Sequence, residues 1–317
     1  MVGKLTRNDT MSASRIPVLL NASPYQTRNE LLADFRNIDK GGEPNWIPQN
    51  EPMFWGDTLE DTILRVAGER LNLKDVRTSF ASAFEHPTLP LAASLDGAAT
   101  GSGVFAADPA NGIYTPQNEP IDLTGEVLLE AKNTGSMPEN PPAAHRGPLQ
   151  LQAQMMCTGI KKGVIAVLYR GNELRLFLYK ADPVIQQRIV TELQDFEERR
   201  KTGEVYPLAD TSDGVVAYPR GGLDRLYFED MTNESLLVDM LVGAIEQKKN
   251  AEEDIEQMTA GLMEGLGEAS ECEVMVGNRT YLVKWPSRTY KAQPERVVPA
   301  KPERTVRSKT LVVKEID

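Results

Sequence analysis

The chain has 317 residues, a formal net charge of −11 and a sequence pI near 4.9. Such an acidic composition disfavours unspecific coating of nucleic acid, although a locally basic path for DNA can exist on an acidic molecule. No run of 18 apolar residues and no apolar signal core is present, so we expect a cytoplasmic protein that neither enters a membrane nor is secreted. The chain has only two cysteines, Cys157 and Cys272, which are far apart in sequence, so it cannot supply a four-cysteine iron–sulfur cluster alone.

Two helices are expected near the N-terminus. Ser14 is a candidate N-cap of a short helix that has Pro17 in its first turn, where proline is tolerated. The start of that helix is either an ordinary cap or a site for a phosphate, because its backbone N–H groups are unpaired. Thr27 and Glu30 form a capping-box pattern that predicts the second helix.

A loop over residues 37–54 is predicted from its glycines and prolines, and a helix is expected directly after it. Asp57 and Glu60 fit a capping box for this helix, which has an apolar stripe of Leu59, Ile63, Val66 and Ala67. Glu60 is therefore either a capping residue or a catalytic one.

Two strands with ionisable side chains are predicted next. Alternation over residues 89–96 predicts a strand that ends at Gly97, with Ser94 and Asp96 on the same face. Residues 126–132 predict a buried central strand with Glu130 and Lys132 on one face. Charged groups inside a sheet need a solvated cleft or a bound cation, so these side chains mark a site.

The segments around these strands are less regular. Residues 97–120 predict an extended hairpin or a mobile loop, and residues 133–148 are proline-rich. A helix with the stripe Leu149, Ala153, Met156 and Ile160 follows. It places Gln150 and Gln154 on a neighbouring face, where they either reach phosphate or water or form a polar flank. A hairpin is predicted over residues 164–179 around Gly171.

The C-terminal third contains predicted helices and strands but no candidate site residue. We expect a surface helix over 183–201, an irregular stretch over 203–225, a long packing helix over 235–269 and a hairpin over 272–284. The tail has eight Lys and Arg residues against four acidic ones and is expected to be flexible. The predicted domains are 1–232, 233–286 and the tail 287–317.

The pattern of Asp96 followed by Glu130-x-Lys132 resembles the PD-(D/E)xK nuclease core. Further pieces occur in order: Ser14-x-Ile-x-x-Leu-Leu-x-x-Ser-Pro-Tyr25, Trp55-Gly-x-x-x-Glu60, Ser94-Leu-Asp96-Gly97 and Gln150-Leu-Gln152 with Thr158-Gly159. Together they resemble the YqaJ-like viral recombinase family, which includes the phage lambda-type exonucleases, over about residues 4–180. The resemblance implies an α/β fold with a restriction-endonuclease-like core, a central mixed sheet flanked by helices.

The resemblance also implies a metal site. Asp96 and Glu130, with the main-chain carbonyl of Ala131, would bind Mg²⁺, for which Mn²⁺ would substitute, and Lys132 would orient or deprotonate the attacking water. By the same resemblance, Glu60 and Gln150 complete the catalytic set. Arg7, Ser14 and Ser94 would form a pocket for a 5′-terminal phosphate, with Gln154 as a further candidate DNA contact.

The implied function is a 5′-to-3′ exonuclease acting on linear double-stranded DNA ends and leaving 3′ single strand for phage-type recombination. A single-strand annealing recombinase is the expected partner, a trimeric ring the expected assembly, and a phage or prophage the expected source. Two alternatives remain: an endonuclease or single-strand nuclease of the same fold, and a non-catalytic DNA-end scaffold that recruits partners through residues 235–317. The chain departs from the family in its Gly97–Gly125 insertion, its acidic net charge and its extra C-terminal third.

Overall fold

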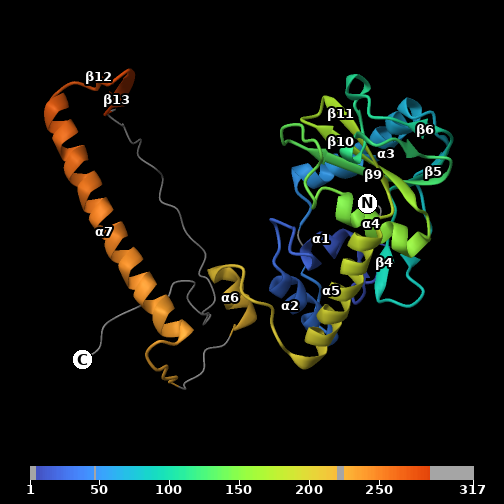
Figure 1. The fold of residues 1–317 in the computed structure, drawn as a ribbon, viewed down its shortest axis with the longest axis horizontal. Helices are drawn as coiled ribbons and strands as arrows, with labels where there is room; N and C mark the ends of the chain where they lie inside the picture. Colours follow the sequence, from blue (N-terminus) through green and yellow to red (C-terminus); the bar gives the residue numbers. More distant parts are fainter. Residues whose placement is uncertain (1–4, 46–47, 220–224, 286–317) are drawn as a thin grey trace, which may run out of the picture. The chain divides into compact units, whose positions relative to one another are not determined.

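A computed structural model describes residues 5–45, 48–219 and 225–285 of the chain (Figure 1). The chain divides into two compact units, Met1–Pro219 and Arg220–Asp317, and each is described here by itself. The predicted domain boundaries after residues 232 and 286 stay a prediction. The predicted tail, residues 287–317, lies outside the described residues.

A mixed sheet forms the centre of the first unit and has six strands within the described residues. The third strand, β9, is the long central strand predicted from the alternation over residues 126–132. Leu128 and Leu129 of β9 are both buried and belong to separate cores on opposite faces of the sheet. In order across the sheet the strands are β2 (Lys74–Arg77), β5 (Gly97–Gly101), β9 (Gly125–Thr134), β10 (Lys162–Tyr169), β11 (Glu173–Lys180) and β7 (Ile113–Tyr114).

One helix covers each face of β9 and β10 (Figure 1). The helix α4 (Pro148–Thr158) connects β9 to β10, which pair in parallel, so these elements form a βαβ unit. Leu151 and Met155 of α4 share a core with Leu128. The helix α3 (Glu51–Arg70) packs its Leu64 and Ala67 in the other core, with Leu129. The fold class is the predicted one, a mixed α/β sheet flanked by helices.

A smaller sheet holds the N-terminal segment beside the central sheet. The strand β1 (Met11–Ser12) pairs in parallel with β4 (Leu91–Ala93), and β4 pairs antiparallel with β3 (Phe84–Glu85). Residues 94–96 then connect β4 to β5 of the central sheet. The predicted strand over 89–96 is therefore wrong at its end, because the chain leaves one sheet at Ala93 and enters the other at Gly97.

The segment after Gly97 is the predicted extended hairpin rather than a mobile loop. The strand β5 pairs antiparallel with β9, and further out β6 (Val104–Phe105) pairs antiparallel with β8 (Ile121–Asp122). Two short 3₁₀ turns complete this excursion, η2 (Pro109–Asn111) and η3 (Pro116–Asn118).

Two predicted helix starts are corrected. The helix α3 begins at Glu51 and not at Asp57, because Asn50 caps it by accepting a hydrogen bond from the Met53 N–H. Ser14 is no N-cap: it lies in the 3₁₀ turn η1 (Ala13–Arg15), which follows β1 directly and leads into α1 (Ile16–Leu19). Pro17 does occupy the first turn of α1, as predicted.

Other predicted elements are confirmed. The helix α2 (Arg28–Asp39) opens with the capping box of Thr27 and Glu30, and β10 and β11 form the predicted hairpin. The helix α5 (Pro183–Thr202) matches the predicted surface helix and buries one face.

Burial raises the pKa of Cys157 to about 12, so this thiol is inert at neutral pH.

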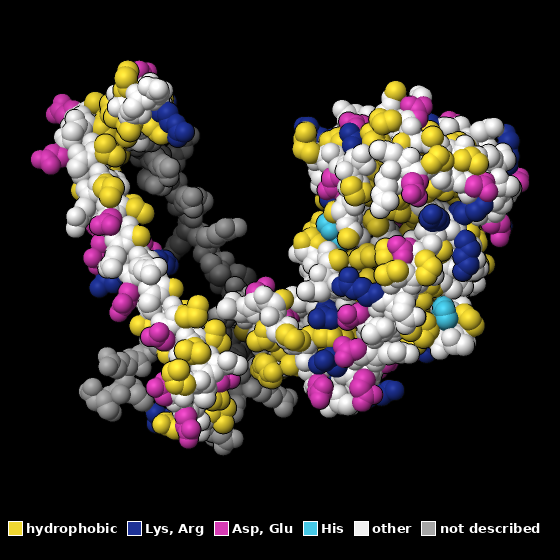
Figure 2. Space-filling view, in the orientation of Figure 1, with side chains coloured by type: hydrophobic (Ala, Val, Ile, Leu, Met, Phe, Trp, Pro, Cys, Tyr) yellow, Lys and Arg dark blue, Asp and Glu magenta, His cyan; other side chains and the backbone are white. Residues whose placement is uncertain are grey.

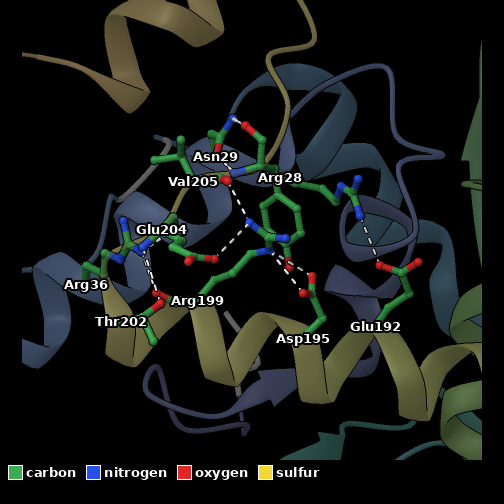
Figure 3. Close-up of polar contacts among 10 residues, drawn as sticks. Arg28, Asn29, Arg36, Glu192, Asp195, Arg199, Thr202, Glu204 and Val205 are labelled. Atoms are coloured by element: carbon green, nitrogen blue, oxygen red, sulfur yellow. Dashed lines mark hydrogen bonds and ion pairs between the residues drawn. The ribbon is translucent and has the colours of Figure 1, made fainter.

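The segment after α5 is fixed by a polar network (Figure 3). The Arg199 guanidinium donates to Asp195 and to the carbonyl of Val205, and Arg36 donates to the carbonyls of Arg199 and Glu204. The amide of Asn29 pairs with both backbone groups of Tyr206. The stretch predicted as irregular over 203–225 thus contains an anchored turn and a short helix, α6 (Thr211–Ala217).

Within the described residues, the second unit contains the predicted long helix α7 (Asn233–Leu266) and the predicted hairpin of β12 (Glu271–Val276) and β13 (Arg279–Lys284). The predicted packing of this helix on another helix stays a prediction. Figure 2 shows hydrophobic and acidic side chains along α7, and most of its apolar residues are exposed in this unit. Among the described helices, none has the length and apolar character needed to span a membrane.

Candidate active site

Asp96, Glu130 and Lys132 meet where β9 passes the connection between β4 and β5. Asp96 accepts a hydrogen bond from the Ala131 N–H at 3.0 Å, which ties it to the strand carrying Glu130. Lys132 lies two residues along the same face, and its ammonium donates to a carboxylate oxygen of Glu130. The Glu130 side chain has no exposed surface, whereas that of Lys132 is 28% exposed. The site thus opens to solvent on the side of Lys132.

Two glutamines of α4 complete the hydrogen bonding of this cluster. Lys132 Nζ donates to Gln150 Oε1 at 3.2 Å, and Gln154 Nε2 donates to Glu130 Oε2 at 2.6 Å. Because α4 packs on the face of β9 that holds Leu128, its glutamines reach the side chains of the same face. Gln154 is fully buried, so it is part of the interior and neither the polar flank nor the accessible DNA contact that the sequence suggested.

Glu60 approaches from α3. It lies in the third turn of the helix, so it is not the capping residue that its sequence position suggested. Burial, followed by the charge of Glu130, raises the pKa of Glu60, and the charge of Lys132 acts in the opposite direction. Glu60 thus interacts electrostatically with Glu130 and Lys132, the predicted site residues of β9.

The charge balance of the cluster favours a bound cation. Burial and then the charge of Glu130 raise the pKa of Asp96 well above its ordinary value, since three carboxylates face a single ammonium group. Burial alone would lower the pKa of Lys132, but the charges of Glu130 and Asp96 outweigh it and raise that pKa. Hard carboxylate oxygens suit Mg²⁺, so the donor set fits that ion. Within the described ranges, no three His, Cys, Asp or Glu side chains are grouped as a metal site on their own.

Of the residues predicted to bind a 5′-phosphate, Ser14 and Ser94 lie just beyond the paired strands β1 and β4, and Arg7 lies before β1. Ser12 is paired with Ala92, so Ser14 and Ser94 each lie two residues beyond this pair. The hydroxyl of Ser94 is 3.1 Å from that of Thr6, the neighbour of Arg7, and the carbonyl of Ser94 accepts from Gln154 at 3.4 Å. Ser94 is therefore the link between this segment and the carboxylate cluster.

Arg7 and Ser14 are accessible. The Arg7 side chain is 71% exposed and pairs with Asp9, whose hydrogen bond raises the pKa of Arg7. Ser14 is exposed, and its hydroxyl lies 3.0 Å from that of Ser12. The structure brings Ser94 next to Asp96 but holds the Arg7 guanidinium on a neighbouring carboxylate.

Sequence reasoning missed Thr6 and the contact of Gln154 with Glu130. Thr6 is buried against Ser94 although it lies in a polar N-terminal segment with no apolar pattern. For Gln154 a signal was present: three glutamines at alternate positions on an apolar helix, Gln150, Gln152 and Gln154, are all buried and all hydrogen-bonded.

Comparison with known families agrees with this geometry. Residues 4–161 match the family described as the YqaJ-like viral recombinase domain. The chain carries a YqaJ-like viral recombinase domain. The matched segment of this YqaJ-like domain runs from just before Arg7 to just after α4 and so contains every predicted site residue. The predicted family is confirmed.

Several solved structures resemble the YqaJ-like domain distantly. The alkaline exonuclease LHK-Exo of Laribacter hongkongensis, in complex with dAMP, is 17% identical with a TM-score of 0.43, over 61% of this chain and 89% of that one. A phage-related exonuclease from Haemophilus somnus is 9% identical with a TM-score of 0.41, over 60% of this chain and 93% of that one. No curated protein matches the sequence.

Proposed function

We propose that this chain is a metal-dependent nuclease that hydrolyses linear double-stranded DNA from its 5′ end and leaves 3′ single strand for recombination. The observation that supports this most directly is the meeting of Asp96, Glu130 and Lys132 in one buried cluster that is open on one side. A protein that only binds DNA has no use for buried carboxylates, which cost free energy unless a cation or another partner compensates them.

Each residue has a proposed role. Asp96 and Glu130, with the carbonyl of Ala131, would hold Mg²⁺ or Mn²⁺, and the bound ion would polarise the scissile phosphate and lower the pKa of a water molecule. Lys132 is held by Glu130 and Gln150, so its ammonium can orient the attacking water and offset charge on the phosphate. Gln150 and Gln154 fix the side chains of β9, and Glu60 adds negative charge from α3.

The preference for a 5′-phosphate is proposed from the residues beside Ser94. Arg7 and Ser14 are exposed, and Ser94 lies two residues from Asp96, so a terminal phosphate bound there would place the first phosphodiester near the carboxylates. The planar guanidinium of Arg7 suits a phosphate and would exchange Asp9 for it. If Arg7→Ala degraded phosphorylated and hydroxyl ends in the wild-type ratio, this pocket would be wrong.

Assembly and partnership belong to the same proposal. A homo-oligomer, a trimeric ring by family resemblance, would keep the protein on one DNA strand during successive cleavages. A single-strand annealing recombinase would receive the 3′ strand. Light scattering of the purified chain measures the size of the oligomer. Co-purification with such a recombinase on resected DNA tests the partnership.

Digestion of linear duplex DNA with Mg²⁺ tests the nuclease directly. We expect mononucleotides from 5′-phosphorylated linear DNA, little cleavage of a covalently closed circle, and a loss of at least about 100-fold in Lys132→Ala. Lys162→Ala is the matched control, because Lys162 lies on the neighbouring strand and donates to the carbonyl of Thr124 outside the cluster. Cleavage of the circle would replace the exonuclease with an endonuclease. No metal-dependent cleavage at all would favour the DNA-end scaffold.

A further inference from the structure

A groove with a volume of about 750 Å³ lies between the start of α3 and the end of β9. Trp55 and Leu59, one helical turn apart, form the wall on α3, and Asn133 and Thr134 form the wall on β9. Leu59 directly precedes Glu60, and Asn133 directly follows Lys132. Each of the two walls therefore includes the sequence neighbour of a candidate active-site residue, Glu60 on α3 and Lys132 on β9.

Two aromatic rings line this groove and remain accessible. Trp55 is 48% exposed and Tyr25 is 81% exposed. The indole N–H of Trp55 donates to Glu51 Oε2 at 3.1 Å, and the ring of Tyr25 meets that of His145 edge-on at 5.6 Å. Trp55 also meets the ring of Phe54 edge-to-face at 5.5 Å, so both groove rings are positioned by their neighbours and still expose apolar surface to a ligand.

Two guanidinium groups lie in the same groove. Arg146 is only 12% exposed and is held by Glu139, Thr134 and Ser136, so it is a positioned cation. Arg170 is exposed, and its backbone φ of 51° lies in the left-handed region. Its guanidinium donates to the sulfur of Met137. Its guanidinium forms no ion pair with any carboxylate of the described residues. Arg170 therefore offers an unneutralised positive charge.

We propose that this groove binds unpaired nucleotides of a DNA strand that enters or leaves the candidate active site. Bases would stack on Trp55 and Tyr25, while Arg170 would attract the phosphates. Stacking needs exposed base faces, which a duplex hides, so the ligand is single-stranded. The inference rests on the proposed function, because it takes DNA to be the substrate, and it adds a binding subsite to it.

Binding of a fluorescent oligothymidylate of about ten nucleotides to the full chain, without divalent metal, separates binding from cleavage. We expect Trp55→Ala and Tyr25→Ala each to raise Kd about 5- to 100-fold, from the usual strength of base stacking. Tyr227→Ala is the matched control, since Tyr227 is 88% exposed and belongs to the other unit. Equal affinity in all three variants and the wild type would overturn the proposal.

The salt dependence tests Arg170. We expect Arg170→Gly, which suits the positive φ at this position, to weaken binding and to reduce the slope of log Kd against log salt by about one. Arg65→Ala is the matched control and should leave the slope unchanged, because Arg65 is exposed on α3 but already paired with Glu69. An unchanged slope in Arg170→Gly would remove Arg170 from the subsite.

Tryptophan fluorescence gives a readout that general charge attraction would not give. Stacking on Trp55 should quench its emission when the oligothymidylate binds, and Trp55→Phe should lose most of that quenching while it retains most of the affinity. Quenching of wild-type size in Trp55→Phe, or equal competition by polyglutamate at the same charge concentration, would overturn stacking. A wild type that cuts DNA but shows no groove dependence refutes the groove alone, and groove-dependent binding without cleavage refutes the nuclease alone.

Discussion

Gln154 donates a hydrogen bond of 2.6 Å to Glu130 inside the protein, where neither side chain has exposed surface. Removing the donor would leave a buried carboxylate oxygen without a partner, which costs about 2 kcal/mol. We expect Gln154→Ala to lower the free energy of unfolding by that amount and to slow DNA cleavage about tenfold or more, because Glu130 loses its fixed position. Urea unfolding and initial cleavage rates measure the two effects.

Gln152 provides the matched control on the same helix. It is buried as well, but it donates to the carbonyl of Lys180 at 3.0 Å and accepts from the Asp182 N–H at 2.8 Å, away from the carboxylates. Gln152→Ala should lose similar stability and keep the wild-type cleavage rate per folded molecule. An equal loss of cleavage in both variants would mean that α4 packing, not the contact with Glu130, is responsible.

Gly97 is required by packing. A Cβ there would lie 2.9 Å from Leu64 Cδ1 and 3.1 Å from Leu129 Cβ, so Gly97→Ala would force the Leu64 side chain and β9 to shift and should cost about 1–3 kcal/mol in thermal or urea unfolding. Gly56→Ala should act in the opposite direction by up to about 1 kcal/mol, since no atom lies within 4 Å of that position in α3. A neutral Gly97→Ala would contradict the close packing.

Glu139 should make stability depend on pH. Burial alone would raise its pKa, but hydrogen bonds from the Ala143 N–H and from Arg146 outweigh burial and lower the pKa below its ordinary 4.5. A lowered folded pKa gives stability that is complete above the unfolded pKa and is lost as pH falls through the folded one. Glu139→Gln should therefore be about 1 kcal/mol less stable than wild type at pH 7, and the difference should shrink as pH falls below the ordinary pKa of 4.5.

The first unit should fold without the second. Its two cores consist of residues before Pro219, and the network around Arg199 anchors its last segment. A chain of residues 1–219 should unfold in one cooperative transition with near-native helix content by circular dichroism. If it is instead a loosely packed state without a cooperative transition, the cores need residues after 219. If residues 1–219 do fold alone, their cleavage rate relative to the full chain measures what the second unit adds.

The parts of the fold that depend on local pattern were predicted correctly. The alternation over residues 126–132 gave the faces of β9, and Gly171 between two apolar runs gave the hairpin of β10 and β11. The capping box at Thr27 opens α2 as expected. These signals lie within a few residues of the structure that they determine.

The wrong predictions concern residues whose structure is determined by contacts with segments distant in the sequence. Both Asn50 and Asp57 can cap a helix, and only the position of α3 against the sheet favours Asn50 and frees Glu60 from a capping role. The end of β4 at Ala93 follows from its exchange of sheets, which the alternation does not reveal. Gln154, for which the sequence left open a contact with phosphate or water and a polar flank, is instead covered by β9 and the 94–96 connection, because α4 links the parallel strands β9 and β10 and packs on their face.

The parallel pairing of β1 with β4 joins Met11 to Leu91 across a long stretch of sequence. Such a short pair closes a large loop for few hydrogen bonds, so it should open more readily than the central sheet. Amide hydrogen exchange at Met11, whose N–H donates to Pro90, should therefore be faster than at Leu129 in β9. Transient release of β1 would separate Thr6 from Ser94 while Glu130 and Lys132 keep their places, so recognition of a DNA end would be lost at lower denaturant than bond cleavage itself.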